Sequence, residues 1–153
     1  MNSLVVFGLI KRLYPDFDMS TFEKRLKLQK IVYLLQAQGI NLGYSFRLYL
    51  YGPYCQELAK TAYYVEDFKK VNLVGFEDPM IEQKFESFVS RITPVKDNIE
   101  WLEIASTIHL FTTLYLKEDT KQIIKRIQEI KPKYTTAFIE QVWTEMKGWI
   151  VPN

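Results

Sequence analysis

Residues 98–116 constrain the fold most strongly, because apolar side chains cover almost the whole helical surface of this segment. Asp97 and Glu100 have the spacing of a helix start, and the residues that follow include Trp101, Leu102, Ile104, Ala105, Ile108, Leu110, Phe111 and Leu114. A helix without a polar face must be covered by other elements on all sides. We therefore expect residues 98–116 to form the central helix of a mainly α-helical protein.

Turn and capping residues place further helices on either side of the central one. Pro15, Gly39 and Pro132 end helical patterns, and Gly52-Pro53 would open a helix with proline at its first position. Asp119 with Gln122 has the spacing of a capping box. The expected helices cover about residues 3–14, 20–38, 54–66, 79–91, 98–116, 119–130 and 135–148.

Residues 45–51 follow a different period, in which Phe46, Leu48 and Leu50 alternate with polar or amphipathic neighbours. This two-residue repeat is typical of a half-buried strand, and residues 70–76 (KVNLVGF) could supply its partner. The expected fold is therefore mainly α, with six or seven helices and a two-stranded antiparallel sheet of about 45–51 and 70–76. A length of 153 residues suits one compact domain over 1–153.

Composition excludes several classes of protein. Hydrophobic residues make up 48% of the chain, which is enough for a packed core and argues against disorder. A single cysteine rules out an internal disulfide, and a net charge of +2 does not by itself imply a nucleic-acid or membrane partner. The apolar start Leu4–Ile10 is short and follows no basic residue, so we expect a cytoplasmic protein without a signal peptide.

The residues that could carry catalysis are few. The chain has no phosphate-binding glycine loop, no H-E-x-x-H and no C-x-x-C motif. His109 lies on the apolar central helix, where a packed core histidine is expected, and Cys55 is expected to be an inert thiol. Asp97, Glu100 and Glu103 share a helical face and could ligate a hard cation, but three acids on one face are a weak signal for a metal site. We expect no enzyme and no cofactor.

Two segments look more like binding surfaces. The first contains four basic side chains within seven residues, which could neutralise phosphates or meet an acidic partner: Lys24, Arg25, Lys27 and Lys30. A solvated helix face is the plainer interpretation of this cluster. The second is rich in tyrosine around Gly52-Pro53, with Tyr49, Tyr51 and Tyr54 near Arg47, and Tyr63 and Tyr64 beyond them.

Tyrosine and arginine are common in interface hot spots because they combine large contact area with a polar end. The same tyrosines could instead pack the sheet against a helix. The candidate partner-binding residues from both segments are Lys24, Lys27, Lys30, Arg47, Tyr49, Tyr51, Gly52, Pro53 and Tyr54.

The stretch from Leu26 to Tyr63 carries a family resemblance. It reads LKLQKIVYLLQ and then YSFRLYLYGPYCQELAKTAY, and it is similar to the YwgA-like family and, more distantly, to the Panacea domain of SocA-like antitoxins. The segment WLEIASTIHLF also looks like a later helix of that family. The resemblance implies a compact α-helical domain with a little β structure and no enzymatic activity, and the Panacea branch implies neutralisation of a protein toxin.

We therefore expect a non-enzymatic regulatory or antitoxin-like protein that acts by protein–protein binding. The alternative is a winged-helix-like nucleic-acid-binding regulator, because three helices and two strands follow one another in a roughly suitable order. Its presumed recognition helix, Tyr54 to Asp67, carries one basic residue, Lys60, which is poor for a DNA groove. An enzyme that uses His109 or Cys55 ranks third.

Overall fold

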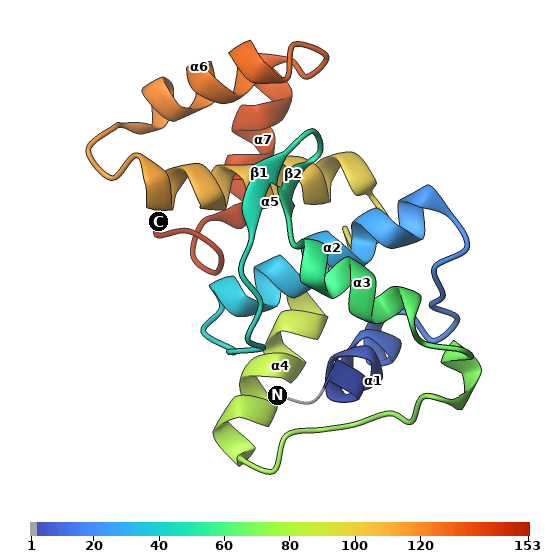
Figure 1. Cartoon of the computed structure of the whole chain (residues 1–153). Coiled ribbons are helices and arrows are strands. Elements are labelled where there is room, and N and C mark those ends of the chain that lie inside the picture. Colours follow the sequence, from blue (N-terminus) through green and yellow to red (C-terminus); the bar gives the residue numbers. More distant parts are fainter. Residues whose placement is uncertain (1–2) are drawn as a thin grey trace.

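Two long helices form the centre of the fold. The computed structural model describes residues 3–153, and in it α2 (Phe22–Ala37) packs against α5 (Ile99–Leu114) (Figure 1). Every residue of α5 from Trp101 to Ile108 is buried. The expectation that the segment 98–116 lies at the centre is therefore confirmed.

Five more helices and a short 3-10 turn surround this pair. They are α1 (Ser3–Leu13), α3 (Gln56–Tyr63), η1 (Phe68–Lys70), α4 (Pro79–Ile92), α6 (Thr120–Ile130) and α7 (Thr136–Met146). The α6 and α7 helices pack against each other and against α5 (Figure 1). The part of the chain that the structure describes thus contains seven α-helices, and the expected mainly α class is confirmed.

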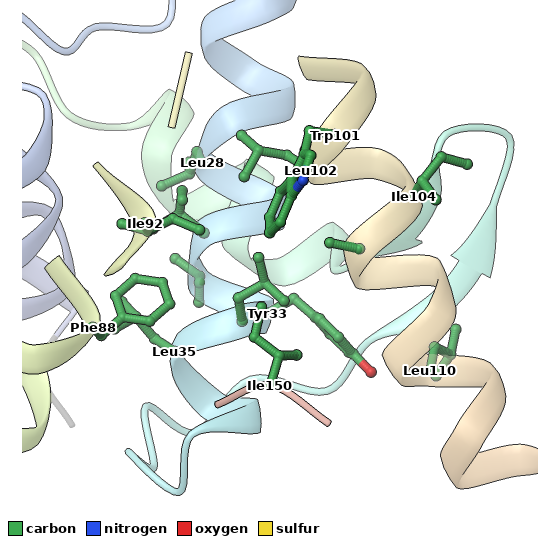
Figure 2. Close-up of a cluster of buried hydrophobic side chains, with 14 of the residues drawn as sticks. Leu28, Tyr33, Leu35, Phe88, Ile92, Trp101, Leu102, Ile104, Leu110 and Ile150 are labelled. Carbon is green, nitrogen blue, oxygen red and sulfur yellow. The ribbon is translucent and has the colours of Figure 1, made fainter. Parts of the chain in front are cut away.

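One core joins all seven helices. Figure 2 shows Phe88 and Ile92 of α4 beside Leu28 and Leu35 of α2, with Trp101 of α5 closing the cluster. These five side chains are buried. None of the described helices combines the length and the apolar character that a membrane span requires.

Local sequence explains where several helices begin. The capping box of Asp119 with Gln122 is formed, since each side chain bonds the other residue's main-chain amide. Asp78 caps α4, with Pro79 at its first position. The central helix is capped by Asn98, whose side chain accepts from the amide of Trp101, and not by Asp97 as the sequence suggested.

The sheet is a hairpin of neighbouring strands. Strand β1 (Arg47–Tyr49) runs antiparallel to β2 (Gly52–Tyr54), with Arg47 opposite Tyr54 and Tyr49 opposite Gly52. Leu50 and Tyr51 form the turn, and Gly52 follows with a φ of +95°, which glycine adopts at little cost. A two-stranded antiparallel sheet is confirmed, but the expected second strand at 70–76 is wrong.

Residues 70–76 are bonded to α1 and not to β1. The ammonium of Lys11 donates to the main-chain oxygens of Phe68 and Val71 at 3.0 and 2.8 Å, and Arg12 donates to that of Val74 at 3.2 Å. Side chains of α1 therefore bond two main-chain acceptors of this segment, those of Val71 and Val74. The segment lies along α1 and forms no strand.

The expected start of the third helix at residue 54 is also wrong. Pro53 lies in β2, and α3 begins at Gln56 with Cys55 as its N-cap. Cys55 has an extended backbone (φ −121°, ψ 112°), and its sulfur accepts from the amide of Leu58 at 3.5 Å. Gly52-Pro53 therefore continues the hairpin, because the turn has already been made at Leu50-Tyr51.

Candidate functional site

The hairpin, residues 47–54, presents a row of exposed apolar side chains. Leu48, Tyr49, Leu50 and Tyr51 are all exposed, and Leu50 at the turn retains 85% of its accessible surface. The exposed ring of Phe22, at the start of α2, packs edge-on against Tyr51 with 5.1 Å between ring centroids. Single exposed apolar residues are ordinary, whereas several neighbouring ones make this hairpin a candidate interaction surface.

Two lysines hold the hairpin from beneath through its main chain. Lys30 of α2 is 1% exposed, and its ammonium donates to the main-chain oxygen of Pro53 at 2.7 Å. Lys131, at the end of α6, donates to the main-chain oxygen of Leu50 at 3.0 Å. The main chain of the hairpin is therefore bonded at Leu50 and at Pro53 to side chains of the helical part of the protein.

A buried carboxylate connects one of these lysines to α5. Glu103 accepts from Lys131 at 2.7 Å with one oxygen and from the Tyr134 hydroxyl at 2.8 Å with the other. Both side chains of the ion pair are less than a tenth exposed. Burial raises the pKa of the Tyr134 phenol, and its hydrogen bond to Glu103 raises it further. The phenol therefore stays protonated and remains a donor to Glu103.

Gln29 binds Cys55, the residue that follows the hairpin. Its side-chain amide donates to the main-chain oxygen of Cys55 at 2.9 Å and accepts from the Cys55 amide at 2.7 Å. Both polar ends of Gln29 are satisfied by one residue, as in the pairing of two strands. Because Gln29 is buried, losing either bond would leave an unpaired polar group in the core.

The hairpin lies directly on α5 at Gly52. A methyl group added at this glycine would lie 2.7 Å from the Thr107 hydroxyl and 3.4 Å from the main-chain oxygen of Glu103. The Thr107 hydroxyl is itself bonded to that oxygen at 2.7 Å. The close approach of hairpin and helix therefore depends on the missing side chain at position 52.

Burial beneath the hairpin changes the pKa of Lys30 strongly. Burial lowers the pKa of its amine to about 7, while Glu103 acts to raise the pKa and Lys131 to lower it. An isolated charge is costly in an apolar interior, so the neutral amine gains relative to the ammonium. Lys30 therefore changes its charge near neutral pH.

A small hollow opens between α2 and the hairpin, directly above Lys30. Its volume is about 160 Å³, and its walls are Phe22 and Leu26 of α2 with Tyr49, Leu50, Tyr51 and Tyr54 of the hairpin. Lys30 and Gly52 also line it. Since each water in the liquid takes about 30 Å³, this space holds about five waters or one large side chain.

The structure separates the residues of the expected basic cluster. Lys24 pairs with Asp18 at 3.2 Å, and Lys27 pairs with Asp97 at 3.1 Å. Lys30 does not belong to an exposed basic face, because the hairpin backbone covers it. The three lysines therefore do not form one surface for phosphates.

The expected residues of the tyrosine-rich segment also divide into exposed and buried ones. Arg47, Tyr49 and Tyr51 are exposed, and Tyr54 is half-buried against the ring of Tyr49, with centroids 5.2 Å apart. Gly52 and Pro53 are buried, which corrects their assignment as contact residues. They serve the site by bringing the hairpin against α5 and Lys30.

Several members of the site were missed from the sequence. These are Phe22, Leu26, Gln29, Leu48, Leu50, Glu103, Lys131 and Tyr134. One usable signal was Glu103, since a carboxylate on a helix without a polar face needs a buried partner. No comparable local signal pointed to Lys131, which looked like the end of a helix before Pro132.

The residues considered for catalysis are bound in structural contacts. The Tyr33 hydroxyl and His109 Nδ1 are hydrogen-bonded at 2.8 Å, and burial lowers the pKa of this histidine. Cys55 is buried at the cap of α3. Among the described residues, no group of three histidine, cysteine or acidic side chains is placed to hold a metal ion. Glu103, once considered for a cation, uses both oxygens on Lys131 and Tyr134.

The site as a whole is an exposed apolar hairpin that rests on buried cations and main-chain hydrogen bonds. The exposed side chains of the hairpin offer contact area, and Lys30, Lys131 and Gln29 hold its main chain in place. Comparison of the chain with protein-family models, with curated proteins and with solved structures finds no match.

Proposed function

We propose that this chain is a non-enzymatic regulatory or antitoxin-like protein that binds another protein through Phe22 and the hairpin. The observation that supports this most is the contiguous exposure of Leu48, Tyr49, Leu50 and Tyr51 on one projecting element. Tyrosine and large apolar side chains that lie together on a surface are typical of interfaces. The resemblance of residues 26–63 to the YwgA-like and Panacea families agrees with this role and remains a prediction.

The anchoring of the hairpin favours recognition of a defined partner. Lys30, Lys131 and Gln29 each bond to its main chain or its exit, so its shape is set before a partner arrives. A surface that is already ordered loses less conformational entropy on binding. The exposed side chains can therefore contribute most of their contact free energy to affinity.

The winged-helix-like alternative stays a prediction without a structural observation in its favour. Two of the three lysines proposed for phosphates are paired with Asp18 and Asp97, and the third is buried. Helix α3 has eight residues and carries Lys60 against Glu57. Binding to DNA would need more cations on an exposed face than this helix offers.

A capture experiment with matched variants tests the proposal. The full chain, tagged, is used to recover proteins from its native cells, alongside a Tyr49→Ala/Tyr51→Ala double variant. The control is a Tyr63→Ala/Tyr64→Ala double variant, which removes two exposed tyrosines outside the hairpin. The partner identified with the unmodified chain is then purified, and its affinity for all three proteins is measured by calorimetry.

We expect one stoichiometric partner that the control still binds and the hairpin variant does not. Each removed hot-spot tyrosine should cost about 2 kcal/mol, which for two corresponds to a loss of roughly a thousandfold in affinity. Equal binding by the hairpin variant and the control would contradict the proposal. Failure to recover any stoichiometric partner would contradict it too.

A further inference from the structure

Strand β1 forms the free edge of the hairpin. Strand β2 packs on α2 and α5, whereas β1 packs chiefly on β2 (Figure 1). All three residues of β1 are exposed, and within residues 3–153 no second strand pairs with its outer side. An uncovered edge of this kind is a template for another strand, because its outward main-chain groups have no partner in the sheet.

Pro53 determines which main-chain groups of β1 point outward. Opposed residues of an antiparallel pair alternate between pairs that exchange two hydrogen bonds and pairs that exchange none. Pro53 has no amide hydrogen, so its pairing with Leu48 is of the second kind. The amide and carbonyl of Leu48 therefore point away from β2, and in the part of the chain that the structure describes no other main-chain group bonds to them.

A second copy of β1 fits this edge best in one register. When Leu48 of each copy faces Leu48 of the other, their main chains exchange two hydrogen bonds across a two-fold axis. Moving the axis one residue towards the N-terminus would set the two Arg47 side chains against each other, and like charges directly opposite are destabilising. Moving it the other way would pair Leu48 with Leu50, whose main-chain oxygen already accepts from Lys131.

The register centred on Leu48 also matches the side chains. Arg47 of one copy lies opposite Tyr49 of the other, on the same face of the joined sheet, and the two-fold axis makes this pair twice. A guanidinium is attracted to the face of a tyrosine ring, and both side chains are exposed in the single chain. On the other face the two Leu48 side chains, each 41% exposed, cover one another.

We propose that two copies of this chain pair antiparallel through β1, centred on Leu48, and join their hairpins into one four-stranded sheet. The inference goes beyond the proposed function, since the second copy supplies every group and no other protein is needed. The strand has three residues, so the interface is small. Small interfaces are typical of transient association, and the dimer should therefore form in a concentration-dependent way.

Sedimentation equilibrium and hydrogen exchange of the full chain test the pairing. We expect the mass to rise from monomer to dimer between about 1 µM and about 1 mM, with a dissociation constant on the order of 0.1 mM. The Leu48 amide should exchange about fivefold more slowly at about 1 mM than at about 1 µM, because an amide bonded in the dimer exchanges only from the monomer. The Tyr49 amide, which already bonds to β2, should change far less.

Charge substitutions test the register. Tyr49→Arg would set an arginine of one copy against Arg47 of the other and should weaken the dimer about tenfold or more. The control Tyr51→Arg adds the same charge at the turn, outside the proposed pair, and should weaken the dimer far less. The double exchange Arg47→Tyr/Tyr49→Arg restores a pair of tyrosine and arginine, so it should restore the association.

Leu48→Pro tests the main-chain bonds. It removes the outward amide hydrogen and keeps the bonds within the hairpin, since proline is tolerated on the open side of an edge strand, and it should weaken the dimer about tenfold or more. Equal association of Tyr49→Arg and Tyr51→Arg would overturn the proposed register, even if Leu48→Pro does not fold. A chain that is still monomeric at about 1 mM would overturn the dimer. If a captured protein then slowed the exchange of the Leu48 amide, the edge would instead bind a strand of that protein.

Discussion

The ammonium of Lys30 lies 2.7 Å from the main-chain oxygen of Pro53, so a side chain of α2 supports the hairpin from inside the protein. The same amine has its pKa lowered to about 7 by burial. Lys30 therefore both holds the hairpin and changes its charge near neutral pH. The lowered pKa of Lys30 should be measurable in solution.

Lys30 should make the protein more stable at alkaline pH. Its pKa is about 7 in the folded protein and near the ordinary 10.5 when unfolded, so the unfolded chain binds more protons between these values. The free energy of unfolding from this group should therefore rise by about 2 kcal/mol between about pH 7 and about pH 9. Urea unfolding of the unmodified chain and Lys30→Met measures it. Identical pH dependence in the two proteins would count against the depressed pKa.

Glu103→Gln should destabilise the protein strongly. The change removes the negative charge from a buried ion pair and leaves Lys131 without its counter-charge, which costs about 3–5 kcal/mol in buried pairs. The matched control is Glu118→Gln, which breaks the pair with Arg126 on the surface. Denaturant unfolding should show a far smaller change for the control. Similar losses in both variants would show that burial of the Glu103 pair is unimportant.

Gly52→Ala should be more harmful than Gly43→Ala. Both glycines have positive φ, +95° and +84°, so alanine is strained at either position. At position 43 a methyl group meets nothing within 4 Å, whereas at position 52 it meets the Thr107 hydroxyl at 2.7 Å. The additional loss at position 52 should be about 1–3 kcal/mol. Thermal unfolding of the two variants measures the difference, and equal losses would exclude a tight contact with α5.

Glu82 should contribute to unfolding by acid. Its carboxylate pairs with Arg12 at 2.6 and 2.8 Å and accepts from the amide of Phe76, and these bonds lower its pKa to about 2 from an ordinary 4.5. A lowered folded-state pKa contributes stability above the ordinary value that is lost as the pH falls towards the folded one. Stability should therefore fall between about pH 4.5 and about pH 2, and Glu82→Gln should flatten the fall. An unchanged acid profile in that variant would assign the loss to other carboxylates.

Much of the helical framework could be predicted from residue patterns. The apolar surface of 98–116 placed α5 at the centre, and Asp119 with Gln122 marked the start of α6, because these features depend on residues close together in the sequence. The partner of β1 could not be found in this way. Lys11 and Arg12 of α1 bond to the main chain of residues 70–76, and such contacts span about sixty positions.

The candidate site was predicted in its exposed part and missed at its base. Tyr49 and Tyr51 were identified because tyrosines and an arginine alternate on a short strand. Lys30 was assigned to the surface, since a helical wheel shows the direction of a side chain but not the main chain that covers it. Lys131 and Glu103 meet only after α5 and α6 have packed, so no local pattern reveals their ion pair.

The anchors of the hairpin bond to main-chain atoms, and this has a consequence for how such a surface can diversify. Lys30 and Lys131 bond to the carbonyl oxygens of Pro53 and Leu50, and Gln29 bonds to the main chain of Cys55. None of these bonds depends on the identity of the side chains at positions 48 to 51. The side chains at those four positions can therefore be replaced, in a designed library or during evolution, without loss of these bonds.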